Sequence, residues 1–582
     1  MAKTGASIRD QWIINTTTGP VKGHAETGVA AFRGIPYAAP PVGELRFRRA
    51  QPIEPWEEVF HADASGHPCP QDHAGSRRSE GTWEGDEDCL WLNVVVPRDT
   101  ANDAADAADS TVIDTDAKRP VVVYIHGGSN VHGSAASPML SGEYFATSID
   151  CVYVGVNYRV GILGQMSLGY GTYTSDDMDT NPGHSDLVTA IRWVHDNAAA
   201  FGGDPGRITI MGESSGGSMV SALLATPQLE GIISAGIAQS PAATIVHTPT
   251  TVGPWVDFAA RWYQRMVDEK DVPPAKRAPV NTAPPELDGP ALKKATEALL
   301  QADAKMLGQL SDELVRYQAD NPESTAGPFA PLVDGDLLPR HPLEPGAMLD
   351  VPLLVGSNRN EYDMMRLEAK PSSMQLRRSQ TFAGLFAAAA DAASDAASDT
   401  AADKASDDSS TDAAAQASAA TADLGPRGLQ ILREHYKDGR SRSMVGRFFG
   451  DAIFTAPAWR MASNHPSGHA WVYRLDTTTP FLRLSGIGSM HALDLPILFQ
   501  RYDLDKGRVA LLLGGRDDFR ITTAAMHNRW RRFIHHHDPG FDPYCHGYAT
   551  QIFDSKIPGG ERTEYDPQSS LRQAWEKVNL VL

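Results

Sequence analysis

"RITIMGESSGGSMVSALLAT" occupies residues 207–226, and the order of its residue types decides the fold. Residues 207–211 carry the branched apolar pattern of a buried β-strand, and 214–226 read as a helix despite their glycines. A serine in Gly-x-Ser-x-Gly between a strand and a helix is typical of a nucleophile elbow, where glycines let the two elements approach closely. The hydroxyl then lies at the helix N-terminus, where the dipole favours developing negative charge. We therefore predict that Ser214 is a nucleophile.

The segments around this stretch alternate between strand and helix patterns. Short apolar runs at 120–125, 151–158, 351–356 and 470–475 have the length and composition of buried strands. Residues 184–203 carry apolar side chains on one helical face and end at glycines. Strands that alternate with helices predict an α/β protein with a mainly parallel sheet covered on both faces.

Two stretches of low complexity interrupt this pattern. Residues 99–118 are rich in Asp and Ala, and residues 387–423 are built almost entirely from Ala, Asp, Ser and Thr. Such segments lack the apolar side chains that a core requires, so we predict surface-loop inserts, the second of them disordered. They carry much of the formal net charge of −20. The rest of the chain is still mildly acidic, which argues against a nucleic-acid partner. We expect residues 1–582 to form a single domain with these inserts.

The composition also bears on location and metal chemistry. The apolar runs are strand-sized and the first residues have no apolar signal core, so we expect a cytoplasmic protein without a membrane partner. The four cysteines form no CxxC pair. The three consecutive histidines at 535–537 would point in different directions on a helix. We predict no metal site.

A serine nucleophile also needs a base, an orienting acid and an oxyanion hole. "YIHGGSN" (124–130) follows a strand and exposes the backbone N–H groups of a glycine pair. "HALDLPILF" (491–499) supplies a histidine after a flexible glycine-containing segment, and "LLVGSNRNEYD" (353–363) supplies an acid just past a strand end. These three segments are the candidates for the missing parts.

The chain resembles the type-B carboxylesterase/cholinesterase family of α/β-hydrolases. The resemblance rests on seven motifs in order: "FRGIPYAAPPVGELRFR" (32–48), "EDCLWLNVVVP" (87–97), "YIHGG" (124–128), "NYRVGILG" (157–164), "FGGDPGRITIMGESSGG" (201–217), "GSNRNE" (356–361) and "GSMHALDLPILF" (488–499). It implies an α/β-hydrolase fold with a mostly parallel central sheet, flanking helices and large loop insertions.

The resemblance also implies the roles of the catalytic residues. Ser214 would be the nucleophile, His491 the general base and acid, and Glu361 the orienting acid, in the chain order that α/β-hydrolases use. On spacing alone Asp494, three residues after the histidine, could supply the acid instead, or could brace the local turn. Glu213, beside the nucleophile, would either tune the charge of the imidazolium or serve as a buried structural acid.

The same resemblance places the oxyanion hole on the backbone N–H groups of Gly128, Ser129 and Ser215. The family usually has alanine where Ser215 stands, but the backbone donor is unchanged. Ser129 stands where glycine or alanine is usual, and Asn130 where an aromatic residue is usual. These departures leave the donors in place and concern the shape of the adjoining pocket.

Cys69 and Cys89 lie where the family often closes a disulfide loop. A reducing cytosol opposes that bond, so we expect that it can form in purified protein and is weak in the cell.

We predict a serine carboxylesterase that takes small-molecule esters and needs no cofactor; the sequence leaves the oligomeric state open, with a monomer favoured. Two alternatives remain open. One is an amidase or carbamate hydrolase with the same triad. The other is a catalytically silent interaction module, as some relatives are, which the presence of Ser214, His491 and Glu361 opposes.

Overall fold

The computed structural model describes residues 12–72, 83–98, 113–173, 176–273, 277–279, 282–320, 327–363, 435–436 and 442–578. The predicted insert at 387–423 and residues 99–112 of the acidic loop lie outside this part of the chain.

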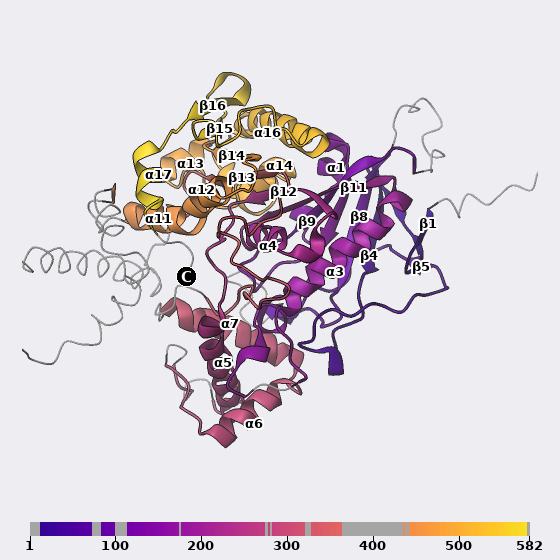
Figure 1. Cartoon of the computed structure of the whole chain (residues 1–582), viewed down its shortest axis with the longest axis vertical. Coiled ribbons are helices and arrows are strands. Elements are labelled where there is room, and N and C mark those ends of the chain that lie inside the picture. Colours follow the sequence, from indigo (N-terminus) through magenta and orange to yellow (C-terminus); the bar gives the residue numbers. More distant parts are fainter. Residues whose placement is uncertain are drawn as a thin grey trace, which may run out of the picture.

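An 11-stranded sheet forms the centre of the protein (Figure 1). Neighbouring strands are parallel from β10 to β15, and the strands outside that block pair antiparallel. In spatial order the strands are β16 (Glu561–Tyr565), β15 (Ala549–Phe553), β14 (Ala470–Leu475), β13 (Leu353–Asn358), β12 (Ile233–Gln239), β11 (Gly203–Glu213), β9 (Arg119–Ile125), β10 (Val152–Val156), β8 (Trp91–Pro97), β4 (Val29–Pro36) and β3 (His24–Glu26). The predicted mainly parallel α/β sheet is confirmed.

Helices cover both faces of this sheet, as its central strands require. Along β9, Val121, Val123 and Ile125 belong to one buried cluster, while Val122 and Tyr124 belong to another. Because successive side chains of a strand point to opposite faces, the two clusters are the two sides of the sheet. The first is covered by α3 (Pro182–Asn197), α4 (Ser215–Leu224) and α12 (Ala456–Ser463), and the second by α1 (Glu143–Ile149), α14 (Asp494–Leu498) and α16 (Arg516–His536).

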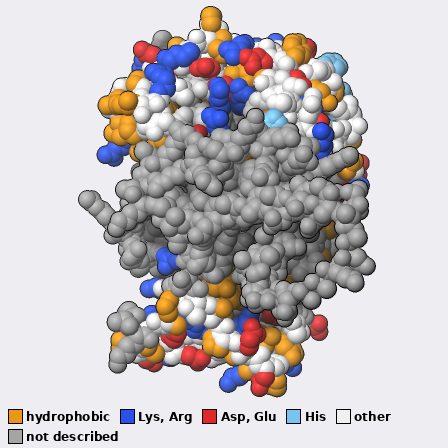
Figure 2. Space-filling model, turned by 90° about the vertical axis from the view of Figure 1, so that its left-hand side faces the viewer, with side chains coloured by type: hydrophobic (Ala, Val, Ile, Leu, Met, Phe, Trp, Pro, Cys, Tyr) orange, Lys and Arg blue, Asp and Glu red, His pale blue; other side chains and the backbone are white. Residues whose placement is uncertain are grey.

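Three further helices extend away from the sheet at the bottom of Figure 1: α5 (Pro249–Glu269), α6 (Gly289–Leu299) and α7 (Ala304–Asp320). The other α-helices of the described residues are α2 (Gly161–Gly164), α11 (Arg442–Gly450), α13 (Pro480–Ser485), α15 (Asp505–Ala510) and α17 (Ser569–Trp575). The described residues also form two small sheets. One is made of β1 (Ile13–Thr16), β2 (Gly19–Lys22) and β5 (Phe60–His61), and the other of β6 (Gln71–Asp72) and β7 (Trp83–Glu84). Above and below the residues drawn grey in Figure 2, side chains of both charges are intermixed on that face.

A buried ion pair joins the loop after β10 to α3. Arg159 Nη2 lies 2.6 Å from Asp186 Oδ1 and its Nε donates to Oδ2 at 2.9 Å, with side-chain exposures of 2% and 0%. Removing one partner of such a pair leaves an uncompensated buried charge. We expect Asp186→Ala to lower the free energy of unfolding by about 3 to 5 kcal/mol, measured by urea denaturation.

The exposed pair Lys293–Glu297 on α6 is the control for this stability prediction. Both side chains are more than half exposed, so Glu297→Ala should change the free energy of unfolding by less than about 1 kcal/mol. Equal effects of the two substitutions would contradict the role given to the buried pair.

Candidate active site

Ser214 lies on a sharp turn between β11 and α4. Its backbone has φ 60° and ψ −124°, a conformation that non-glycine residues rarely adopt, and its N–H donates to the carbonyl of Gln239 at 2.9 Å. The glycines on either side of Ser214 are required because neither position has room for a Cβ atom. A Cβ at Gly212 would lie 2.5 Å from the carbonyl oxygen of Gly216, and a Cβ at Gly216 would overlap that of Ile125.

A line of hydrogen-bond contacts joins three side chains from separate parts of the chain. His491 Nε2 lies 2.9 Å from Ser214 Oγ, and His491 Nδ1 lies 2.6 Å from Glu361 Oε2. The Glu361 side chain is 1% exposed, whereas His491 keeps 19% exposure. The imidazole therefore connects a buried carboxylate to a half-buried serine.

Glu361 is itself held by two donors that the sequence did not reveal. Its Oε1 accepts from Ser240 Oγ at 2.7 Å and from the backbone N–H of Asn358 at 2.6 Å. Ser240 follows β12 directly, so its place at the carboxyl end of the strand beside β11 was the available signal. Both bonds leave Oε2 for the imidazole, which fixes the direction of the carboxylate.

Two further contacts hold His491, one on its ring and one on its backbone. Phe454 stacks on His491 with the ring centroids 4.5 Å apart and the planes 24° from parallel. Phe454 belongs to a π-helical turn, Asp451–Thr455, between α11 and α12. Lys506 Nζ donates to the carbonyl of His491 at 2.8 Å. Sequence patterns gave no sign of either partner, because each belongs to a separate element whose packing against His491 is set by the fold.

The acids named as further candidates surround the same histidine. Glu213 Oε1 lies 3.4 Å from His491 Nε2, and burial raises the pKa of Glu213 to about 7. Asp494 Oδ2 accepts from Gln239 Nε2 at 2.5 Å, and burial raises the pKa of Asp494 to about 6. Of the two acids considered for Nδ1 of the imidazole, Glu361 is the one at hydrogen-bond distance.

These carboxylates change the proton affinity of His491. Burial opposes the charged imidazolium, but the negative charges of Glu213 and Glu361 outweigh it and raise the pKa of His491 above its ordinary value. A protonated imidazole is thus favoured after it has taken a proton from a neighbouring hydroxyl.

The residues of the predicted oxyanion hole lie beside Ser214. A Cβ at Gly127 would be 3.1 Å from the Cβ of Ser214, so the loop after β9 passes close to the serine. Gly128 and Ser129 have φ of 131° and 58°, and Ser215 is the first residue of α4. Among the described residues, the N–H groups of these three positions have no backbone partner. These N–H groups are therefore available to donate hydrogen bonds to an oxygen atom of a bound substrate.

The remaining sequence candidates lie elsewhere. Cys69 and Cys89 are buried free thiols close enough for a hydrogen bond between them, and burial raises the pKa of Cys89. His535 of the histidine run contacts the backbone carbonyl of Ile149 through Nε2 at 2.9 Å. In the described part of the chain no three His, Cys, Asp or Glu side chains are grouped to hold a metal ion. Nor does any helix within those ranges have the length and apolar character to span a membrane.

The sheet is mainly parallel, and the serine on its strand–helix elbow is hydrogen-bonded to a histidine. These features together define the α/β-hydrolase class. The sequence model of the carboxylesterase family matches residues 10–557, and the chain belongs to that family. It is a carboxylic ester hydrolase.

Relatives and solved structures cover almost the whole chain. Para-nitrobenzyl esterase of Bacillus subtilis (strain 168) is 29% identical over 579 residues, 96% of this chain and 98% of that protein. Phenmedipham hydrolase of Pseudarthrobacter oxydans is 29% identical over 540 residues, 91% of each. A thermophilic para-nitrobenzyl esterase structure superposes with a TM-score of 0.71 at 26% identity, covering 97% of this chain and all of that one. A Geobacillus stearothermophilus carboxylesterase gives a TM-score of 0.66 at the same identity and coverage.

Proposed function

We propose that the chain hydrolyses carboxylic esters through Ser214, His491 and Glu361, with an acyl-enzyme intermediate on Ser214. The single observation that carries this proposal is the continuous contact from Glu361 through His491 to Ser214, at 2.6 and 2.9 Å. Those distances are in the range that proton transfer between a serine and its base requires.

In the first half of the reaction, Ser214 Oγ attacks the ester carbonyl carbon while His491 Nε2 takes the hydroxyl proton. The carbonyl oxygen becomes an oxyanion that accepts hydrogen bonds from the N–H groups of Gly128, Ser129 and Ser215. His491 then gives its proton to the leaving alkoxide, which departs as the alcohol. The acyl group remains bonded to Ser214.

In the second half, His491 takes a proton from a water molecule, which attacks the acyl carbon through a second oxyanion. Collapse of that intermediate breaks the bond to Ser214, and His491 returns the proton to Oγ. Throughout, Glu361 holds the imidazole with Nδ1 as donor and stabilises the positive charge that forms on the ring. The carboxylate of Glu213 adds to that stabilisation.

Small esters of p-nitrophenol and p-nitrobenzyl alcohol are the first substrates to test, since a relative of similar length is a para-nitrobenzyl esterase. Comparing acetate, butyrate and octanoate esters measures the depth of the acyl pocket. Anilides of the same acids are the matched amides, and higher kcat/KM for anilides than for esters would favour an amidase instead.

Covalent trapping tests the nucleophile directly. We expect a fluorophosphonate to inactivate the enzyme with one equivalent bound, and peptide mass spectrometry should find the adduct on Ser214. The adjacent Ser215 is an internal control on the same peptide. An adduct on another residue, or inactivation without an adduct, would contradict the proposal.

The pH dependence of kcat/KM should report the acids around His491. The imidazole must be neutral to act as a base, so activity should rise with pH along a limb centred above 6.5, the ordinary pKa of histidine. Glu213→Gln removes one of the negative charges that raise this pKa. We expect its limb to move to lower pH by about one unit, with a lower kcat on the plateau.

Glu213 and His491 titrate together, because burial also raises the pKa of Glu213 to about 7. Glu297→Gln, an exposed change of the same charge on α6, should leave the limb in place. A limb that Glu213→Gln does not move would show that Glu213 has no influence on the base.

A further inference from the structure

The loop that carries the oxyanion N–H groups is fastened at both ends. At its beginning, the hydroxyl of Tyr158 donates to the carbonyl of His126 at 2.8 Å. At its end, the side-chain amide of Gln71 accepts from the N–H of Gly133 at 2.8 Å and donates to its carbonyl at 3.0 Å. The N–H groups of Gly128 and Ser129 lie between these two points.

The middle of the loop has a strained backbone. Ser129 and Asn130 are consecutive non-glycine residues with φ of 58° and 61°, in the left-handed region that costs free energy for residues with a side chain. Such a conformation persists only where surrounding contacts hold it. Asparagine tolerates it better than most residues.

Asn130 makes contacts that hold this part of the loop. Its side-chain Nδ2 donates to the carbonyl of Phe329 at 3.1 Å, and its backbone carbonyl accepts from the N–H of Gly161 at 2.6 Å. The residue is 4% exposed. A buried hydrogen bond to a fixed acceptor resists displacement of the loop in the direction of that bond.

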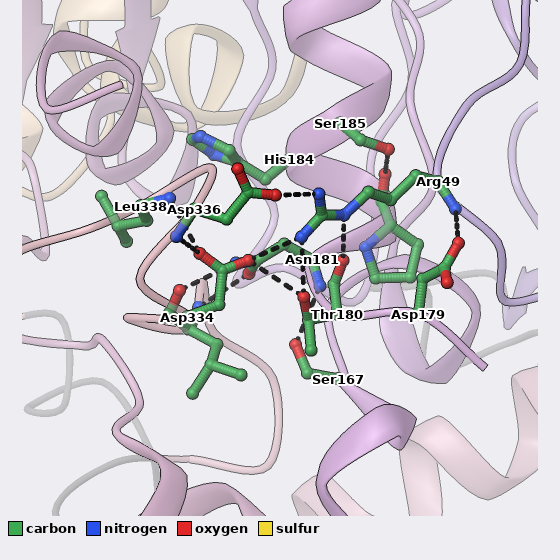
Figure 3. Close-up of polar contacts among 12 residues, drawn as sticks. Arg49, Ser167, Asp179, Thr180, Asn181, His184, Ser185, Asp334, Asp336 and Leu338 are labelled. Carbon is green, nitrogen blue, oxygen red and sulfur yellow. Dashed lines mark hydrogen bonds and ion pairs between the residues drawn. The ribbon is translucent and has the colours of Figure 1, made fainter. Parts of the chain in front are cut away.

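The acceptor belongs to a segment that is itself fixed. The N–H of Ala330 donates to the carbonyl of Gln165 at 3.0 Å, and the amide of Asn181 exchanges two bonds of 2.8 Å with the backbone of Leu332. Asp334 then accepts from the side chains of Asn181, Thr180 and Arg49 at 2.9 Å each (Figure 3).

The charge of Asp334 is retained by that network. Burial opposes the ionised carboxylate, but hydrogen bonds from the backbone of Leu338 and Asp336 and from neighbouring side chains outweigh it and lower the pKa of Asp334. The segment that presents the Phe329 carbonyl is therefore tied to the start of α3.

We propose that Asn130 is a positioning residue for the oxyanion hole, whose side chain aims the N–H groups of Gly128 and Ser129 by tying the loop to the Phe329 carbonyl. The inference rests on the proposed function. It assigns a role to a position where the sequence departs from the family pattern. The tie acts on the tetrahedral intermediate, because the oxyanion meets those donors only after the serine has attacked.

Two substitutions separate the effect of the Asn130 side-chain hydrogen bond from the effect of its backbone conformation. Asn130→Gly keeps the left-handed conformation accessible and removes the side-chain donor. Asn130→Ala removes the donor and also penalises the conformation. We expect kcat to fall about 10- to 100-fold in the glycine variant and further in the alanine variant, with KM changed less than about twofold.

The affinity of the enzyme for a trifluoromethyl ketone distinguishes the two roles. It would not change if Asn130 only stabilised the fold. The adduct of the ketone with Ser214 carries an oxyanion, so its inhibition constant should rise by about the same factor as kcat/KM falls. The limb of the pH profile should stay where it is in the wild type, because the side-chain hydrogen bond of Asn130 goes to Phe329 and not to the acids that set the pKa of His491.

The matched control is Asn464, whose Nδ2 donates to the carbonyl of Leu343 at 2.6 Å, at the end of α12. Asn464→Ala should lower the melting temperature without changing kcat or ketone affinity.

Wild-type kcat and ketone affinity in Asn130→Gly would overturn the inference, as would equal kinetic losses in Asn464→Ala. If Ser214→Ala is inactive while Asn130→Gly is unchanged, the inference fails alone. If Ser214→Ala is active, the proposed function fails.

Discussion

Replacing Ser214 by alanine should reduce kcat for p-nitrophenyl butyrate by about 10⁴- to 10⁶-fold, the largest effect expected of any single change in this chain. The substitution removes the atom that bonds to the acyl carbon, while the hydrogen-bond donors of the oxyanion hole remain. The residual rate should therefore stay above that of the uncatalysed reaction. Initial rates at saturating substrate, with circular dichroism to verify folding, make the measurement.

Ser215→Ala is the matched control, one residue along the same turn. Its backbone N–H is kept, and its side-chain oxygen is buried without a hydrogen-bond partner among the described residues. We expect kcat within about threefold of wild type, since removing an unsatisfied buried hydroxyl costs little. Comparable losses in the two variants would mean that the turn as a whole, and not the Ser214 hydroxyl, is needed.

Replacing Glu361 by glutamine should lower kcat by about 10⁴-fold without unfolding the protein. Oε1 of this residue accepts from Ser240 Oγ and the N–H of Asn358, so the amide oxygen of glutamine will occupy that place. The amide NH₂ must then face Nδ1 of His491. The imidazole responds by carrying its proton on Nε2, where it can no longer accept the proton of Ser214.

The Ser240 contact supplies a graded test of this argument. In Glu361→Gln with Ser240→Ala, the constraint on Oε1 is weaker, and the amide can turn its oxygen toward Nδ1. We therefore expect the double variant to recover part of the lost kcat, whereas Ser240→Ala alone should lose about tenfold. Additive losses in the double variant would refute the tautomer explanation. Glu361→Asp, which keeps the charge but shortens the side chain, should fall between wild type and Glu361→Gln.

Local patterns were sufficient for the fold class and for the place of Ser214 on a strand–helix turn. The strand at 207–211, the glycines around Ser214 and the helix after it are features of neighbouring residues. The structure has β11, the elbow and α4 at those places. The same holds for the strands read at 120–125, 351–356 and 470–475, which are β9, β13 and β14. The apolar runs that form a buried parallel sheet are visible without knowing what they pack against.

Local patterns did not decide which carboxylate contacts His491. Asp494 and Glu361 were both open on spacing, because spacing along the chain does not fix which carboxylate reaches Nδ1 of an imidazole. The family resemblance favoured Glu361, and in the fold Asp494 is engaged by Gln239 on β12. Which carboxylate reaches Nδ1 of His491 therefore depends on the paths of the loops after β13 and β14, and these paths belong to the tertiary structure.

What the sequence alone determined is therefore the class of fold, the serine on its elbow and the order of the segments that supply its partners. Tertiary structure decided the contacts of Ser240 with Glu361, Phe454 with His491 and Asn130 with Phe329. Each of these joins residues more than 30 positions apart, on elements that meet only when the sheet and its helices are packed. Periodicity and turn chemistry report on neighbours along the chain, whereas such contacts depend on the register and crossing of whole elements.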